Sequence, residues 1–149
     1  NKKYIFNNIN KKIKPVSDII DKSYKQYFKY EEKYKLVECD NKSSMMKYKL
    51  INKKTNKGGR QGERVYSINN YGPTICASSG GPGAKTGLYE IENKKIRTLN
   101  IKETLKMLRF KETYKYTTLK NKNKMLFYLG NSIVVEVLNN IINNLKHIL

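Results

Sequence analysis

Residues 57–67 read KGGRQGERVYS, residues 72–81 read GPTICASSGG, and residues 84–89 read AKTGLY. Eight of the nine glycines of the chain lie within residues 58–87, between short runs of β-forming residues. Glycine lets a loop approach a ligand closely, although ordinary hairpin turns also use it. This pattern predicts glycine-rich loops that join three strands, at residues 64–68, 74–77 and 88–91.

The segment before these loops is rich in Lys and Tyr. After Pro15, residues 16–21 predict a helical turn that Ser17 or Asp18 caps. Residues 45–51 (MMKYKLI) alternate and predict a strand. Five aromatic residues recur at roughly helical spacing, which indicates a stripe on a small core more than base stacking: Tyr24, Tyr27, Phe28, Tyr30 and Tyr34.

The segment after the loops is predicted to be helical. In residues 101–110, apolar side chains share one helix face, and Asn100 with Glu103 forms a capping-box pattern. Gly130-Asn131-Ser132 predicts a turn before a final helix over residues 133–149, whose last turn holds His147. The apolar band of this helix is broad, so it either covers the local core or docks on another surface.

The composition favours a partner that carries phosphate. The 149 residues are one domain's worth of chain, with 31 Lys+Arg against 12 Asp+Glu and a net charge of +19. Such a charge attracts phosphate and releases its counterions. Only four of these cations are Arg, so a compositional drift towards Lys on solvent-exposed faces is the alternative explanation of the charge.

Other classes of function find little support in the sequence. We see no signal peptide and no apolar run of the ~18 residues that a membrane span needs. Cys39 and Cys76 lie in unrelated contexts, so neither a disulfide framework nor a metal site is expected, and a reducing, cytoplasmic setting fits best.

Several boxes occur in one order along the chain. The three quoted segments are followed by IRTLNIKE at residues 96–103 and GNSIVVEV at residues 130–137. Together they resemble the C-terminal third of cytosine-5 DNA methyltransferases, and most closely the HhaI-type enzymes, which methylate the inner cytosine of GCGC. The resemblance is strong from about residue 57 onward and weaker over residues 1–56.

The resemblance assigns DNA-binding roles to two loops. Arg64 matches the arginine that reads a guanine, for which a guanidinium fork is suited. Gln61 matches the glutamine that fills the space of the flipped cytosine and pairs with the orphaned guanine. Gly59 and Gly62 would let this loop lie close to the DNA. The second loop would contribute Thr74, Ser78, Gly80, Gly81 and Lys85.

The same resemblance implies a cofactor and further partners. Arg97 and Glu103 match a pair that organises the recognition domain. Asn131 and Ser132 match the box that closes over S-adenosyl-L-methionine, most of which would be bound by an N-terminal catalytic half. Double-stranded DNA and that half are the partners expected, in a restriction-modification setting at the bacterial nucleoid.

Departures from the family pattern leave the exact target open. Asn100-Ile101-Lys102 stands where Thr-Pro-Arg is usual, Arg109 replaces a Gly, Tyr128 replaces a Gln, and Arg60 resembles an insertion. A Phe-x-Gly-x-Gly loop, a Pro-Cys dipeptide and a Glu-Asn-Val box are absent from these residues. Because a thiolate must attack the cytosine, we expect the chain alone to be catalytically inactive, whether it is a split subunit or a fragment.

We therefore expect an α+β fold, incomplete relative to the full methyltransferase. Residues 1–56 would lead in and start the recognition domain, 57–95 would carry its loops in a small twisted β-rich lobe, and 96–149 would form a helical C-terminal segment. Without a catalytic domain, four side chains of the last helix should be partly exposed: Val134, Val137, Ile141 and Ile142. A stand-alone basic DNA- or RNA-binding protein is the alternative.

Overall fold

The fold is built on one five-stranded mixed sheet. The structure is a computed structural model that describes residues 14–39, 45–116 and 121–146. The strands occur in the spatial order β1-β2-β3-β4-β5, and only β3 and β4 are parallel. Their bounds are β1 Tyr34–Glu38, β2 Met46–Asn52, β3 Arg64–Ser67, β4 Leu88–Glu92 and β5 Lys95–Arg97.

The parallel pair explains where the glycine-rich loops meet. The connection between β3 and β4, residues 68–87, must return to the end of the sheet where β3 begins. Residues 58–63 lead into β3 at that same end. Chain topology therefore brings the two loops together, although β3 separates residues 58–63 from residues 72–81 along the chain.

Alternating side chains divide the core between the two faces of the sheet. Val65 and Leu88 pack on one face with Leu50 and Ile96. Their chain neighbours Tyr66 and Tyr89 point to the opposite face, where Val16 and Leu99 cover them. Val16 belongs to a short 3-10 helix, η1 (Val16–Ile19). Both faces of the central strands are therefore buried, which fixes their register.

A third apolar cluster joins two helices to the loop between β3 and β4. Helix α1 (Ile101–Met107) contributes Leu105, and Leu108 follows it. Helix α2 (Lys122–Gly130) contributes Met125, Leu126 and Leu129, and the loop contributes Ile75. The second glycine-rich loop is thereby anchored on α2.

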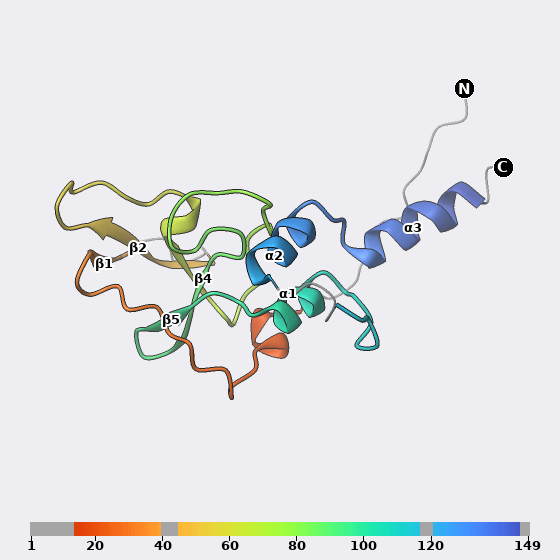
Figure 1. Cartoon of the computed structure of the whole chain (residues 1–149), viewed down its shortest axis with the longest axis horizontal. Helices are drawn as coiled ribbons and strands as arrows, with labels where there is room; N and C mark the ends of the chain where they lie inside the picture. The colour runs from red at the N-terminus through yellow and green to blue at the C-terminus, as the bar shows by residue number, and fades with distance from the viewer. Residues whose placement is uncertain (1–13, 40–44, 117–120, 147–149) are drawn as a thin grey trace, which may run out of the picture.

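Helix α3 (Val135–Lys146) projects away from this body, as Figure 1 shows. All its residues are described and none is buried; Val137 is 45% exposed. Val137 and Ile142 are exposed, and Val134 and Ile141 are half-buried, which confirms the expected partial exposure. The helix is amphipathic with an apolar side that the described residues leave uncovered.

No membrane span was expected from the sequence, yet Lys122–Lys146 is long enough for one and contains an 18-residue window with a mean hydropathy of 1.4. The structure interrupts this stretch at residues 131–134, between α2 and α3. Met125, Leu126 and Leu129 of α2 are also buried in the third cluster, whereas Phe127 is exposed. A span needs continuous satisfied backbone with lipid-facing side chains, so this feature is weak evidence for one.

The α+β class is confirmed, as are the helical turn at η1, the strands at β2, β3 and β4, and the helices α1 and α3. Two expectations were wrong: the strand at residues 74–77, which is an irregular loop, and the side-chain cap of the first helical turn. Tyr30 and Tyr34 of the aromatic stripe pack into a small core as expected, although the segment that carries them is not helical. η1 has Pro15 at its N-cap position, without a side-chain cap. His147 lies outside the described residues.

Candidate nucleic-acid interface

The first glycine-rich loop presents two exposed polar side chains. A short 3-10 turn, η2 (Gln61–Glu63), leads directly into β3, and the Glu63 carboxylate accepts a hydrogen bond from the backbone N–H of Arg60 (3.1 Å). This bond fixes the turn locally. Gln61 and Arg64, at its two ends, are both exposed. The two residues expected to read and replace bases therefore share one surface.

The guanidinium of Arg64 is held by the loop that precedes it. Its Nε donates to the carbonyl oxygen of Gly59 at 3.0 Å. Burial raises the pKa of the neighbouring Tyr66 hydroxyl, and the positive charge of Arg64 partly offsets that rise. A guanidinium anchored at Nε has a fixed plane, which is the geometry that bidentate recognition of guanine needs.

Lys49 was missed by sequence reasoning, although the alternation of residues 45–51 contained the signal. It pairs with Arg64 in the β2–β3 register, so both side chains emerge from the same face. The stem of Lys49 also lies against Gly59, since an added Cβ there would be 3.4 Å from Lys49 Cδ. Lys49 thus adds a second cation beside Arg64.

The two glycine-rich loops pack against each other through backbone. A Cβ on Gly62 would lie 1.9 Å from the carbonyl oxygen of Gly80, so only glycine fits there. Gly81 adopts φ +94°, and Gly83 N–H donates to the Gly62 carbonyl at 2.7 Å. Gly62 is thus brought against Gly80 and Gly81, and contacts of these glycines and of Gly59 with DNA stay a prediction.

Lys85 connects parts of the second loop to each other and to α2. Its ammonium donates to the Ala77 carbonyl at 2.7 Å and lies over the ring of Phe127 in α2, 5.6 Å from the centroid. Its own N–H donates to Ser79 Oγ at 3.1 Å. Thr74 and Ser78 are exposed on the same loop. Contacts of Lys85, Thr74 and Ser78 with DNA stay a prediction.

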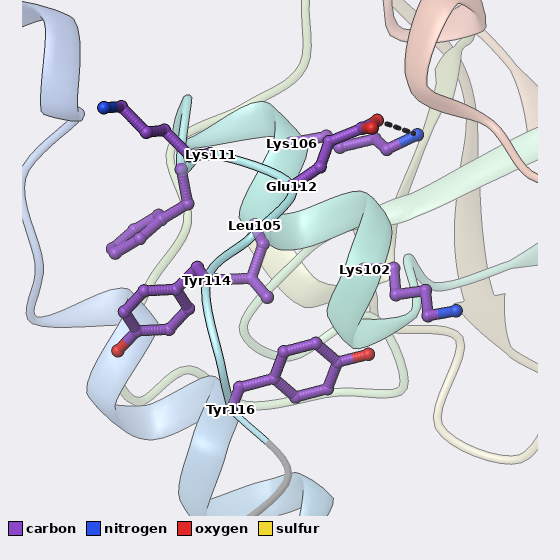
Figure 2. Close-up of a pocket in the computed structure, with 8 residues that line it drawn as sticks. Lys102, Leu105, Lys106, Lys111, Glu112, Tyr114 and Tyr116 are labelled. Carbon is purple, nitrogen blue, oxygen red and sulfur yellow. Dashed lines mark ion pairs between the residues drawn. The ribbon is translucent and has the colours of Figure 1, made fainter.

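Two hollows differ in whether the expected DNA-binding residues line them. An open groove of about 530 Å³ is lined by Gln61 and Arg64, with Tyr66, Thr74 and the Met45–Met46 pair around it. A second hollow of about 270 Å³ lies between α1 and residues 110–116 and has aromatic and lysine walls (Figure 2). No expected DNA-binding residue lines the second one, and Lys106 there pairs with Glu112 at 3.3 Å.

Arg97 and Glu103 form a buried ion pair beneath the interface. Two parallel hydrogen bonds of 2.8 Å and 2.7 Å join them, and both side chains are at most 1% exposed. Glu103 also accepts from the backbone N–H groups of Asp21 and Asn100, both at 2.7 Å. Arg97 donates to the Asp21 carbonyl at 3.1 Å and stacks on Tyr24. The pair thus ties β5, α1 and the segment after η1 together.

The box expected to approach a cofactor lies at the end of α2. Asn131 and Ser132 are exposed, and their side chains donate to the carbonyls of Phe127 (3.3 Å) and Leu129 (2.7 Å). A Cβ on Gly130 would lie 2.1 Å from the backbone nitrogen of Ala77, so this box rests on the second recognition loop. Two exposed polar side chains fit one edge of a cofactor site, not a complete one.

Comparison with known proteins agrees with this arrangement. The pattern of the family described as C-5 cytosine-specific DNA methylase matches residues 1–147. The chain is 38% identical over 89 residues to Type II methyltransferase M.HhaI of Haemophilus parahaemolyticus, a match that covers 60% of this chain. Its fold resembles the crystal structure of the S. pombe Dnmt2 methyltransferase, with a TM-score of 0.52 and 13% identity over 95% of this chain.

The chain is short relative to both proteins. The matched part spans 26% of M.HhaI and 44% of the Dnmt2 chain. The family pattern nevertheless covers almost the whole chain. The chain belongs to the C-5 cytosine-specific DNA methylase family.

Proposed function

We propose that this chain is the target-recognition and cofactor-closing portion of an S-adenosyl-L-methionine-dependent DNA cytosine-5 methyltransferase of restriction-modification type, acting in the cytoplasm on a GCGC-like target. The observation that carries the proposal is the pairing of exposed Gln61 and Arg64 at the two ends of η2. One side chain can fill a vacated base position while the other reads a neighbouring guanine.

Catalysis needs groups beyond these residues. Attack on cytosine requires a thiolate, and neither Cys39 nor Cys76 follows the proline that marks the family's nucleophile. S-adenosyl-L-methionine supplies the methyl group, and Asn131 with Ser132 would border it. We therefore propose that a catalytic portion, covalently joined or separate, covers the apolar side of α3 and completes the site.

Duplex binding tests the recognition role. Fluorescence anisotropy would compare a GCGC duplex with a scrambled duplex of equal length. The wild-type chain should prefer GCGC, and Arg64→Ala should reduce that preference by about fivefold or more, because a bidentate guanine contact contributes about 1–3 kcal/mol.

Arg60→Ala is the matched control. Arg60 is exposed in the same loop and carries the same charge, but its structural contact is made by its backbone N–H. It should weaken both duplexes alike and leave the preference intact. Equal loss of preference in the two variants would mean that only charge acts, as in a stand-alone basic binding protein.

A further inference from the structure

A half-buried cysteine lies between the two recognition loops and touches the side chain that is proposed to enter the DNA. Gln61 Nε2 donates to Cys76 Sγ at 3.1 Å. The thiol of Cys76 in turn donates to the Thr74 carbonyl at 3.5 Å. Since the single thiol hydrogen is directed at Thr74, the sulfur can only accept from Gln61. The amide nitrogen, not the amide oxygen, must therefore face Cys76.

This orientation has a consequence for the opposite end of the amide. A guanine that has lost its cytosine presents two donor groups, N1–H and N2–H, beside one acceptor, O6. With Nε2 held by Cys76, Gln61 Oε1 is left to face outward from an exposed side chain. An outward acceptor is what the two guanine donors need.

Cys76 is itself held in place from two sides. Its backbone N–H donates to the Lys85 carbonyl at 2.8 Å. The peptide between Cys76 and Ala77 is covered by Gly130, where a Cβ would lie 2.2 Å from the Cys76 carbonyl carbon. Ile75, the preceding residue, is buried against α2. The sulfur is thus attached to the packed part of the molecule and not to a free loop.

We propose that Cys76 is a positioning residue for Gln61, which fixes the amide so that its oxygen faces the orphaned guanine, and that Gly130 holds Cys76 in that place. This inference rests on the proposed function, because it assumes that Gln61 enters the DNA. It adds a residue for which the resemblance gave no role, and it links the cofactor-box glycine to base replacement.

A duplex with an abasic site at the inner cytosine of GCGC isolates this step, because Gln61 can then enter without flipping a base. The measured quantity is the ratio of dissociation constants for the intact and the abasic duplex. The wild-type chain should prefer the abasic duplex, and Gln61→Ala should abolish that preference. Cys76→Ala should lower it by about threefold to tenfold, the range of one hydrogen bond.

Four further variants separate positioning from general damage to the fold. Cys76→Ser retains a group that donates to Thr74 and accepts from Gln61, so it should restore most of the preference. In the Cys76→Ala/Gln61→Ala double variant, the loss should equal that of Gln61→Ala alone. Cys39→Ala, a change at the other half-exposed cysteine, should leave the ratio unchanged. Gly130→Ala should lower the ratio as Cys76→Ala does.

The outcomes distinguish a failure of the positioning role from a failure of the proposed function. If Cys76→Ala weakens binding to both duplexes equally and leaves the ratio at its wild-type value, positioning is overturned. Additive losses in the double variant would overturn it as well. If the wild-type chain does not distinguish GCGC from a scrambled duplex, the proposed function fails first. If it prefers GCGC but the abasic ratio does not respond to Cys76 or Gly130, only the present inference fails.

Discussion

The buried pair of Arg97 and Glu103 offers a sharp test of how the interface is supported. Both side chains are fully buried and share two hydrogen bonds of 2.8 Å and 2.7 Å. Removing one member leaves the other charge buried without its partner, which costs about 3–5 kcal/mol. In Glu103→Leu, the N–H groups of Asp21 and Asn100 also lose their acceptor. A domain has only about 5–15 kcal/mol of stability, so a large share of it would be lost.

The assay is a double-mutant cycle in urea, followed by circular dichroism. Arg97→Met and Glu103→Leu should each cost about 3 kcal/mol or more, while the double variant should cost less than the sum by at least about 2 kcal/mol, because it leaves no unpaired charge. Costs below about 1 kcal/mol for each single variant, or costs that simply add, would refute the view that this pair joins β5, α1 and the segment after η1.

Three other perturbations follow from the same structure. Gly62→Ala should destabilise the chain and abolish GCGC preference, since its Cβ would overlap the Gly80 carbonyl. Gly80→Ala should be tolerated, because the space around Gly80 is open. Equal thermal midpoints for the two variants would contradict the packing of the two loops. The uncovered apolar side of α3 should let copies of the chain associate, so Leu138→Glu and Ile142→Glu should reduce the associated fraction seen by light scattering without lowering the thermal midpoint. A fall in that midpoint would mean that the helix is packed internally. Burial alone would raise the pKa of Glu90, but its bonds with Lys47 and the Lys94 N–H lower it below the ordinary value, and bonding to Glu90 raises the pKa of Lys47. The pair therefore stabilises the fold from above the ordinary carboxyl pKa up to the ordinary lysine pKa, and that contribution is lost on acidification through the lowered Glu90 pKa. Because Lys47 is 43% exposed, Glu90→Gln should cost no more than about 1 kcal/mol at pH 7, and urea titrations should show that cost shrinking towards pH 3.

Much of the fold could be predicted because local pattern and burial agree. Residues 64–67 and 88–92 are β-forming runs between glycine loops, and the Asn100–Glu103 capping box formed as its spacing indicated. The aromatic stripe packs on the core as expected, but its helical spacing does not reflect a helix. Tyr30 and Tyr34 are four residues apart, but Tyr34 begins β1, where sheet packing overrides the helical period. The strands β1 and β5 were not predicted, and β5 is only three residues long. α2 lies in the segment that was predicted to be helical, but its bounds were not predicted because its sequence is weakly amphipathic.

The sequence indicated the exposed residues of the candidate interface but not the residues that pack against them. Gln61 and Arg64 stand in a local motif, so sequence could indicate them. Cys76 accepts a hydrogen bond from Gln61, 15 positions away, and Lys49 lies opposite Arg64 through the strand register; neither relation is visible in a linear pattern. The contact between Gly130 and the Cys76–Ala77 peptide depends on where α2 packs, which is a tertiary property.

The most direct test of the central claim is the ratio of dissociation constants for scrambled and GCGC duplexes, measured at low and at moderate salt. Affinity itself should fall with salt, because a net charge of +19 binds phosphate on any duplex. If Arg64 reads a guanine, the ratio stays well above one at both salt concentrations and falls only in Arg64→Ala. A ratio near one at both concentrations would contradict target recognition by this chain.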